Sequence, residues 1–256
     1  MSSEAESRSL RFTLLVPALN EIDGMRAIMP RIRREWVDQI LVVDGKSTDG
    51  TPDWARAQGY DVVVQEKAGL RQGYMAALPY IIGDAVITFS PDGNSIPELI
   101  PTLVAKMREG YDMVIVSRYL QKARSEDDDL VTAFGNWMFT KLINWVHGSH
   151  YTDSTVMFRA YRIRLIRNLE LDRDEGYQPM ERLLFTQTSW EWLISIRAAR
   201  CGLRCAEIPG NEPRRIGGKR KLQPIRWGLF MLWQLFREKL VAPPKAYQRT
   251  GPSTSS

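Results

Sequence analysis

The chain has 256 residues, of which 44% are hydrophobic and 25% are charged, and its formal net charge is +5. This composition excludes an intrinsically disordered chain, and the length suits one large domain or two small ones. The positive excess is modest, no run of about 18 apolar residues would span a membrane, and we expect no nucleic-acid partner.

The first half of the chain alternates short apolar segments with amphipathic ones. Continuously apolar strands that are separated by helices predict a mostly parallel sheet covered on both faces, an α/β fold. Pro52 and Pro97 stand where a helix begins, which supports this reading. The predicted strands are 12–16, 40–43, 61–64, 85–89 and 113–116, and the predicted helices are 24–35, 52–58, 73–82 and 97–108.

The second half of the chain is less regular and is rich in aromatic residues. We expect a helix over 133–147, helical or strand-like pieces near 155–161, 181–187 and 190–200, and an amphipathic helix within 223–242 whose core is 224–240. The resulting division is a disordered leader at 1–10, one α/β domain at 11–222, the amphipathic helix and a disordered tail at 243–256. Cys201 and Cys205 lack the spacing of a zinc site, and the polar start of the chain lacks a signal-peptide core, which together indicate a reducing, cytoplasmic location.

Polar residues follow three of the predicted strands, at the edge where an open parallel sheet binds ligands. Residues 17–21 follow the first strand, Asp44 follows the second, and Asp92 and Asn94 follow the fourth. Carboxylates from neighbouring strands repel one another unless a cation or hydrogen-bond donors lie between them, so a metal ion and a donor-rich ligand are expected there. A glycine-rich dinucleotide motif and a P-loop are both absent from these turns.

Six motifs then identify a resemblance to the family 2 glycosyltransferases with the GT-A fold, in the branch around dolichyl-phosphate mannose synthase. The motifs are VPALNE (16–21), VVDGKSTDGT (42–51), SPDGNSIPE (90–98), SRY (117–119), DSTVMFRAYR (153–162) and RIGGKRKL (215–222), so the resemblance covers about residues 12 to 225.

The resemblance implies a nucleotide-sugar donor and a bound Mg²⁺ or Mn²⁺. The family's DxD metal motif keeps only its last acid here, Asp92, and Asn94 is expected to add an oxygen ligand. Gly45 stands where the family often has a second acid, and Ser90 stands at the first position of DxD. The expected nucleotide-sugar-binding residues are Pro17, Ala18, Asn20, Glu21, Asp44, Arg71, Asp92, Arg215, Arg220 and Lys221, where Arg71 in the stretch GLRQGY adds charge and the last three lie with Gly218 in a basic lid.

The residues expected to act on the acceptor and the leaving group are Asp153, Glu181, Arg118 and Arg215. Transfer to a hydroxyl needs a base, for which Asp153 and Glu181 are the candidates. In the lipid-phosphate branch, an arginine at the position of Arg118 binds the acceptor phosphate. A second arginine of that branch is replaced by Ala133, and the acids at 126–129 oppose an anionic acceptor.

We therefore expect an inverting glycosyltransferase that moves a sugar from a UDP- or GDP-sugar to a polyprenyl phosphate or a small hydroxyl acceptor. One alternative acceptor is a soluble nucleoside or natural-product intermediate. A non-catalytic nucleotide-sugar binder or scaffold is an alternative of another class, whereas a nucleotidyltransferase would need a glycine-rich loop in place of VPALNE. The helix at 224–240 either packs on the domain or lies on the inner face of the membrane, in which case the enzyme is peripheral. The sequence does not predict the oligomeric state.

Overall fold

The computed structural model describes residues 10–216 and 224–247. Its central feature is a seven-stranded sheet with the strand order β3-β2-β1-β4-β6-β5-β7. The strands are β1 (Phe12–Ala18), β2 (Gln39–Asp44), β3 (Asp61–Val64), β4 (Ala85–Thr88), β5 (Met113–Ser117), β6 (Arg159–Arg162) and β7 (Cys205–Pro209).

All strands of this sheet except β6 run in the same direction. β1 pairs in parallel with β2 and β4, β2 pairs in parallel with β3, and β5 pairs in parallel with β7. β6 is antiparallel to both β4 and β5. The carboxyl ends of the six parallel strands therefore meet at one edge of the sheet, where the polar turns of the sequence come together.

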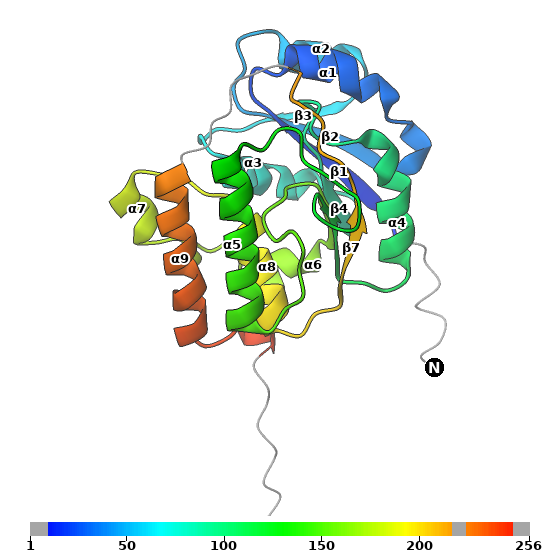
Figure 1. Ribbon diagram of the computed structural model, residues 1–256. Coiled ribbons are helices and arrows are strands. Elements are labelled where there is room, and N and C mark those ends of the chain that lie inside the picture. Colours follow the sequence, from blue (N-terminus) through cyan, green and yellow to red (C-terminus); the bar gives the residue numbers. More distant parts are fainter. Residues whose placement is uncertain (1–9, 217–223, 248–256) are drawn as a thin grey trace, which may run out of the picture.

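Helices cover both faces of the sheet and form two separate hydrophobic cores (Figure 1). On one face lie α1 (Ile22–Ile28), α2 (Thr51–Ala57) and α4 (Ile100–Arg108). On the other face lie α3 (Leu70–Ala77), α5 (Leu130–His147), α6 (Arg164–Asn168), α7 (Met180–Leu184), α8 (Glu191–Arg200) and α9 (Pro224–Leu240). Single turns of 3-10 helix cover Met29–Arg31, Arg34–Trp36, Leu78–Tyr80, Pro97–Leu99, Asp174–Gly176 and Lys245–Tyr247.

The predicted mostly parallel α/β sheet is confirmed, and the differences concern single elements. The helix expected over 24–35 ends at Ile28, because Pro30 forces a 3-10 turn and the chain becomes extended at Ile32. β7 was not predicted, since it is short and carries the polar Glu207 in its middle. The piece near 155–161 is the antiparallel strand β6, and the pieces near 181–187 and 190–200 are the helices α7 and α8.

α9 packs on the domain along one of its faces. It contacts α5, α7 and α8, and it buries Phe230, Leu235 and Glu238. The Glu238 carboxylate lies 2.9 Å from Arg197 and 2.7 Å from Arg200, both on α8. Burial alone would raise the pKa of Glu238, but its hydrogen bonds and charge contact with Arg197 lower it overall. In the described ranges, α9 and the other helices are all too short or too polar to cross a bilayer.

Candidate active site

The turn after β2 is built around the side chain of Asp44. This carboxylate is almost fully buried, and its Oδ2 accepts hydrogen bonds from the backbone N–H groups of Lys46 (2.9 Å) and Ser47 (3.0 Å). Its Oδ1 is buried and makes no hydrogen bond to any described residue. The Asn20 side chain accepts from the Thr48 N–H at 2.8 Å, which ties this turn to the loop after β1. Asp44 therefore shapes the turn and keeps one acceptor atom for a ligand.

A cavity of about 830 Å³ opens at the carboxyl edge of the sheet. Its size is in the range of ligand pockets in proteins. The loop after β1, the turn after β4, and the segment between α7 and α8 form its walls together with Trp227 of α9, whose indole N–H donates to Thr186 at 3.0 Å. The predicted residues that line this cavity are Pro17, Ala18, Glu21, Asp92, Glu181 and Arg215. Asn20 and Asp44 are not among the residues that line it: Asn20 joins the loop after β1 to the turn after β2, and Asp44 shapes that turn.

The turn after β4 brings Asp92, Asn94 and Arg215 together. Arg215 Nη1 lies 3.2 Å from Asp92 Oδ2, and the Ile216 N–H donates to the Asp92 carbonyl at 2.8 Å. Asp127 joins this group, because it accepts from Asn94 Nδ2 at 3.2 Å and its Oδ2 lies 3.7 Å from Arg215. The first residues of the basic lid, Arg215 and Ile216, are thus attached to the turn that carries Asp92.

These side chains suit a hard divalent cation. They offer carboxylate and amide oxygens, and Asn94 Oδ1 is buried without a hydrogen-bond partner among the described residues. No group of three or more His, Cys, Asp or Glu side chains in the described ranges could hold a metal ion by itself. The arrangement thus fits an ion that takes its remaining ligands from water and from a bound diphosphate.

A second cavity of about 340 Å³ shares a wall with the first. Asp92, Arg215 and Trp227 line both, whereas Arg118 and Glu212 line only the second. Two adjoining cavities with a common acidic and basic wall suit a reaction between two substrates. Glu212 was not singled out in the sequence, where it is a single acid before the basic lid.

Arg118 is held by a cluster of carboxylates beside the second cavity. Its Nε and Nη2 donate to the two oxygens of Asp153 at 2.7 and 3.1 Å, and its Nη1 lies 3.1 Å from Glu212 and 3.6 Å from Asp128. Asp153 is fully buried, which alone would raise its pKa, but the charge and hydrogen bonds of Arg118 lower the pKa overall. Burial raises the pKa of Glu212 despite the same arginine.

The geometry bears on two of the expected roles on the acceptor side, and both roles stay predictions. Asp153 lines neither cavity, and its carboxylate is enclosed by Arg118, Asn136 and Thr155. It positions Arg118 in this structure, and its role as a base stays a prediction. The Arg118 guanidinium faces the second cavity while paired with carboxylates, so a phosphate there would have to compete with those partners.

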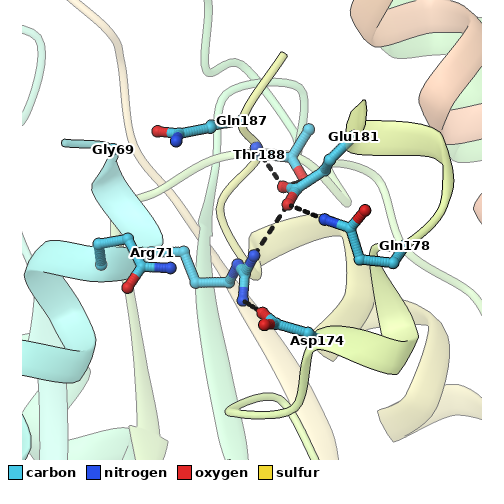
Figure 2. A pocket seen from close by; sticks show the side chains of 8 residues that line it. Gly69, Arg71, Asp174, Gln178, Glu181, Gln187 and Thr188 are labelled. Carbon is cyan, nitrogen blue, oxygen red and sulfur yellow. Dashed lines mark hydrogen bonds and ion pairs between the residues drawn. The ribbon is translucent and has the colours of Figure 1, made fainter. Parts of the chain in front are cut away.

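Arg71 is the centre of a second ion network, beside the first cavity (Figure 2). Its guanidinium lies 2.7 Å from Asp174 and 2.9 Å from Glu181, and it stacks 3.9 Å above the ring of Tyr177. Glu181 also accepts hydrogen bonds from the Thr188 N–H at 2.8 Å and from the Thr188 hydroxyl at 3.0 Å. In this structure Arg71 holds Glu181, which lines the cavity and accepts hydrogen bonds from both Arg71 and Thr188. The expected contact of Arg71 with the nucleotide and the expected role of Glu181 as a base stay predictions.

The residues of this network line a small polar hollow of about 160 Å³, which shares Gly69, Glu181 and Gln187 with the first cavity. The partners of Arg71 come from a segment more than 100 residues away, and no sequence signal singled out Asp174 or Thr188. The expectations for Gly218, Arg220 and Lys221 lie outside the described residues.

Comparison with known proteins shows the family of this chain. The sequence model described as "Glycosyl transferase family 2" matches residues 13–169. An undecaprenyl-phosphate mannosyltransferase of Micrococcus luteus is 28% identical over 253 residues, which cover 90% of this chain and 99% of that protein. A dolichyl-phosphate hexose transferase of Haloferax volcanii is 30% identical over 190 residues, covering 74% of this chain and 76% of that protein.

Solved structures show the same fold. The glucosyl-3-phosphoglycerate synthase of Mycobacterium tuberculosis in complex with UDP has a TM-score of 0.63 and 21% identity, and the alignment covers 93% of this chain and 83% of the other. The same enzyme with Mn²⁺, UDP and phosphoglyceric acid has a TM-score of 0.64 and 20% identity, with 93% and 82% covered. The predicted GT-A fold is confirmed.

Proposed function

Because the chain belongs to glycosyl transferase family 2, we propose that it transfers a sugar from a nucleoside-diphosphate sugar to a polyprenyl phosphate, with inversion at the anomeric carbon. The observation that supports two substrates is the pair of adjoining cavities that share Asp92 and Arg215. The donor would bind in the larger cavity, and the head group of the acceptor would enter the smaller one beside Arg118. The lipid-phosphate relatives support the choice of acceptor.

The state of the acidic side chains favours a phosphate over a hydroxyl acceptor. A hydroxyl must lose a proton to a base, whereas a phosphate monoester has a second pKa of about 6 and offers an oxygen that is already ionised near neutral pH. Asp153 is enclosed, and Glu181 accepts hydrogen bonds from Arg71, Thr188 and Gln178. The two residues considered as bases are thus both engaged, as a phosphate acceptor permits.

In this proposal a phosphate oxygen of the acceptor forms a bond to the anomeric carbon as the bond from that carbon to the nucleoside diphosphate breaks. Asp92 and Asn94 would hold Mg²⁺ or Mn²⁺, and the cation would neutralise charge on the leaving diphosphate. Arg215, which pairs with Asp92 here, is placed to bind the same diphosphate through its planar guanidinium. Asp44 would accept from the nucleoside through Oδ1.

The test is a transfer assay with UDP-, GDP- and dTDP-sugars, a short-chain polyprenyl phosphate, and either Mn²⁺ or Mg²⁺. We expect one donor to give a lipid-linked sugar phosphate detected by mass spectrometry, with the inverted anomer seen by NMR. The matched control acceptor is the polyprenol without its phosphate, which should give no product. Transfer to the polyprenol or to a soluble nucleoside, or binding of a nucleotide sugar without any transfer, would contradict the proposal.

A further inference from the structure

The candidate cation site offers less negative charge than the motif it resembles. Ser90 stands at the first position of DxD, so the turn after β4 carries one carboxylate, Asp92, where the motif carries two. Both residues line both cavities, and only 7% of the Asp92 side chain is exposed. The affinity of an oxygen site for a hard divalent cation rises with the number of charged ligands. A second acid is therefore expected near this turn, from another part of the chain.

Asp127 is an acid that reaches this turn from the loop between β5 and α5. Its Oδ2 accepts a hydrogen bond from Asn94 Nδ2 at 3.2 Å, across 33 positions of sequence, and both residues line the second cavity with Asp92. Because this bond uses the nitrogen of the amide, it leaves Asn94 Oδ1 to a ligand, and Oδ1 is buried without a partner among the described residues. The loop itself is anchored, since the Glu126 N–H donates to the Glu212 carbonyl at 2.8 Å.

A positive charge already lies between Asp92 and Asp127. The guanidinium of Arg215 has Nη1 3.2 Å from Asp92 Oδ2 and Nη2 3.7 Å from Asp127 Oδ2. Two carboxylates so placed would repel each other without a cation between them. Arg215 Nε is buried and makes no hydrogen bond to any described residue. The place between the two carboxylates therefore suits a cation, and in this structure an arginine side chain lies there.

We propose that Asp127 supplies the second carboxylate ligand of the Mg²⁺ or Mn²⁺ site, in place of the acid that is absent at Ser90, and that Arg215 is the counter-ion of this site until the donor binds. With the donor bound, Asp92, Asp127 and Asn94 would hold the cation, and Arg215 would pair with the diphosphate. One positive group then replaces another between the carboxylates, so no buried charge is left without a counter-charge. This role of Asp127 rests on the proposed function, because that function brings the diphosphate to this wall.

Two variants should change the binding of the cation in opposite directions. Asp127→Asn removes a charged ligand and should weaken the binding of Mn²⁺ alone at least about tenfold. Arg215→Met removes the competing cation and should strengthen that binding about tenfold, because Mn²⁺ no longer displaces a guanidinium. A damaged fold would weaken binding in both variants, so the opposite signs report on the site.

The test is titration of the full chain with Mn²⁺, without any sugar nucleotide, in which electron paramagnetic resonance measures the free ion. The matched control is Glu126→Gln, which makes the same change of charge at an exposed side chain one position earlier in the same loop, and which should bind Mn²⁺ as the wild type does. Addition of UDP or GDP should then tighten Mn²⁺ binding by a larger factor in the wild type than in Arg215→Met, since the diphosphate offers Arg215 new partners.

A double variant separates a ligand from a residue that acts through Asn94. If Asp127 only orients the Asn94 amide, Asp127→Asn should have no effect on Mn²⁺ binding in a chain that already carries Asn94→Ala. As a ligand, Asp127 should contribute about as much in that chain as in the wild type. Melting temperatures of all variants establish that a loss of binding is not a loss of fold.

The outcomes separate this proposal from the proposed function. Three results would overturn it even if sugar transfer succeeds: equal Mn²⁺ binding by Asp127→Asn and the wild type, binding by Arg215→Met that is no tighter, or no Mn²⁺ binding by the wild type with or without UDP or GDP. An effect of Asp127→Asn that disappears in the Asn94→Ala chain would overturn it as well. The opposite signs of the two variants support the proposal even if the transfer assay fails, in which case only the proposed function is lost.

Discussion

Two arginines, Arg71 and Arg118, each hold carboxylates beside one of the two cavities, but their surroundings differ. Arg118 lies among Asp153, Glu212 and Asp128, and Asp153 is completely buried. Arg71 lies between Glu181, which is buried, and Asp174, whose side chain is 73% exposed. If Arg71 were removed, water could solvate the exposed carboxylate of Asp174. If Arg118 were removed, water could not reach the buried carboxylate of Asp153.

This difference in solvent exposure indicates which of the two networks is rigid and which tolerates structural change. Breaking a buried ion pair leaves a charge without solvent, while an exposed pair is worth little because water replaces the lost contact. The region around Arg118, which is the proposed acceptor side, is thus expected to be fixed before any substrate binds. The donor side, around Arg71, keeps part of its network open to solvent and can tolerate change.

Replacing each arginine in turn tests whether the two networks differ in their contribution to stability, and it should give the largest effects. Arg118→Met should lower the free energy of unfolding by about 3–5 kcal/mol, because Asp153 loses its bidentate partner in a fully buried position. Arg71→Met should cost about 1–3 kcal/mol, since Glu181 keeps the hydrogen bonds from Thr188. Urea denaturation followed by tryptophan fluorescence measures both values. Equal costs would show that burial of the partner does not decide the outcome.

The next largest effect is on activity, at the wall that the two cavities share. Asp92→Ala should lower kcat/KM for sugar transfer about 100-fold or more, because the proposed cation would lose its only carboxylate ligand at the DxD position. Asn94→Ala should lower it less and raise the Mn²⁺ concentration needed for half-maximal rate. Turnover of Asp92→Ala near the wild-type level, with an unchanged metal dependence, would refute the assignment of the metal site.

The contrast between the two networks also explains what the sequence could predict. The proposed donor side could be predicted from the sequence, because its strands β1, β2 and β4 are mainly apolar and its polar turns directly follow them. Asp92 and the loop after β1 were found in this way and line one cavity. β7 was missed, and with it the parallel pairing that brings Glu212 next to Arg118.

The partners of the two arginines could not be predicted for a physical reason. Arg71 meets Glu181 across 110 positions of sequence, and Arg118 meets Glu212 across 94. Such pairs depend on how helices pack on the sheet, for which local spacing gives no signal. The same limit applies to Asp153, whose motif indicated a functional residue but not that Arg118 would enclose it.

An effect of intermediate size is the pH dependence of the folding stability that Asp153 contributes. The pKa of this carboxyl in the folded protein lies below its ordinary value, because the pairing with Arg118 outweighs burial. The folded state therefore binds this proton less tightly than the unfolded state. The stabilisation is complete above the unfolded value of about 3.9 and is lost as the pH falls through the lower folded value.

Melting curves recorded as a function of pH test this point against Asp153→Asn. The variant should be less stable than the wild type near neutral pH, and the gap should narrow in the acid range below about pH 4. The amide keeps the size of the side chain, so the comparison reports on the charge. Two curves that stay parallel down to the acid limit would mean that Asp153 contributes no linked proton.

A smaller effect is expected from Glu181→Gln on the donor side. The amide keeps the shape and can still accept from Thr188, but it loses the charge opposite Arg71, so stability should fall by about 1–2 kcal/mol. Because Glu181 lines the larger cavity, where the donor is proposed to bind, KM for the nucleotide sugar should rise while kcat changes little. A base would behave differently: kcat would collapse, and the acid limb of the pH–rate profile would disappear. Steady-state kinetics across pH therefore distinguish positioning from catalysis.

The smallest effect should come from Asp174→Asn, which sits in the same network as Glu181. Its ion pair with Arg71 has an N–O distance of 2.7 Å, the same as in the pair of Arg118 and Asp153, so distance alone would predict equal contributions to stability. Exposure argues otherwise: water solvates Asp174 in both variants, so the free energy of unfolding should change by less than about 0.5 kcal/mol, and KM for the donor should stay the same. A loss as large as that of Glu181→Gln would mean that Arg71 needs both carboxylates to stay in place over Tyr177. The donor side would then be as rigid as the acceptor side, and the difference between the two networks would lie in their positions alone.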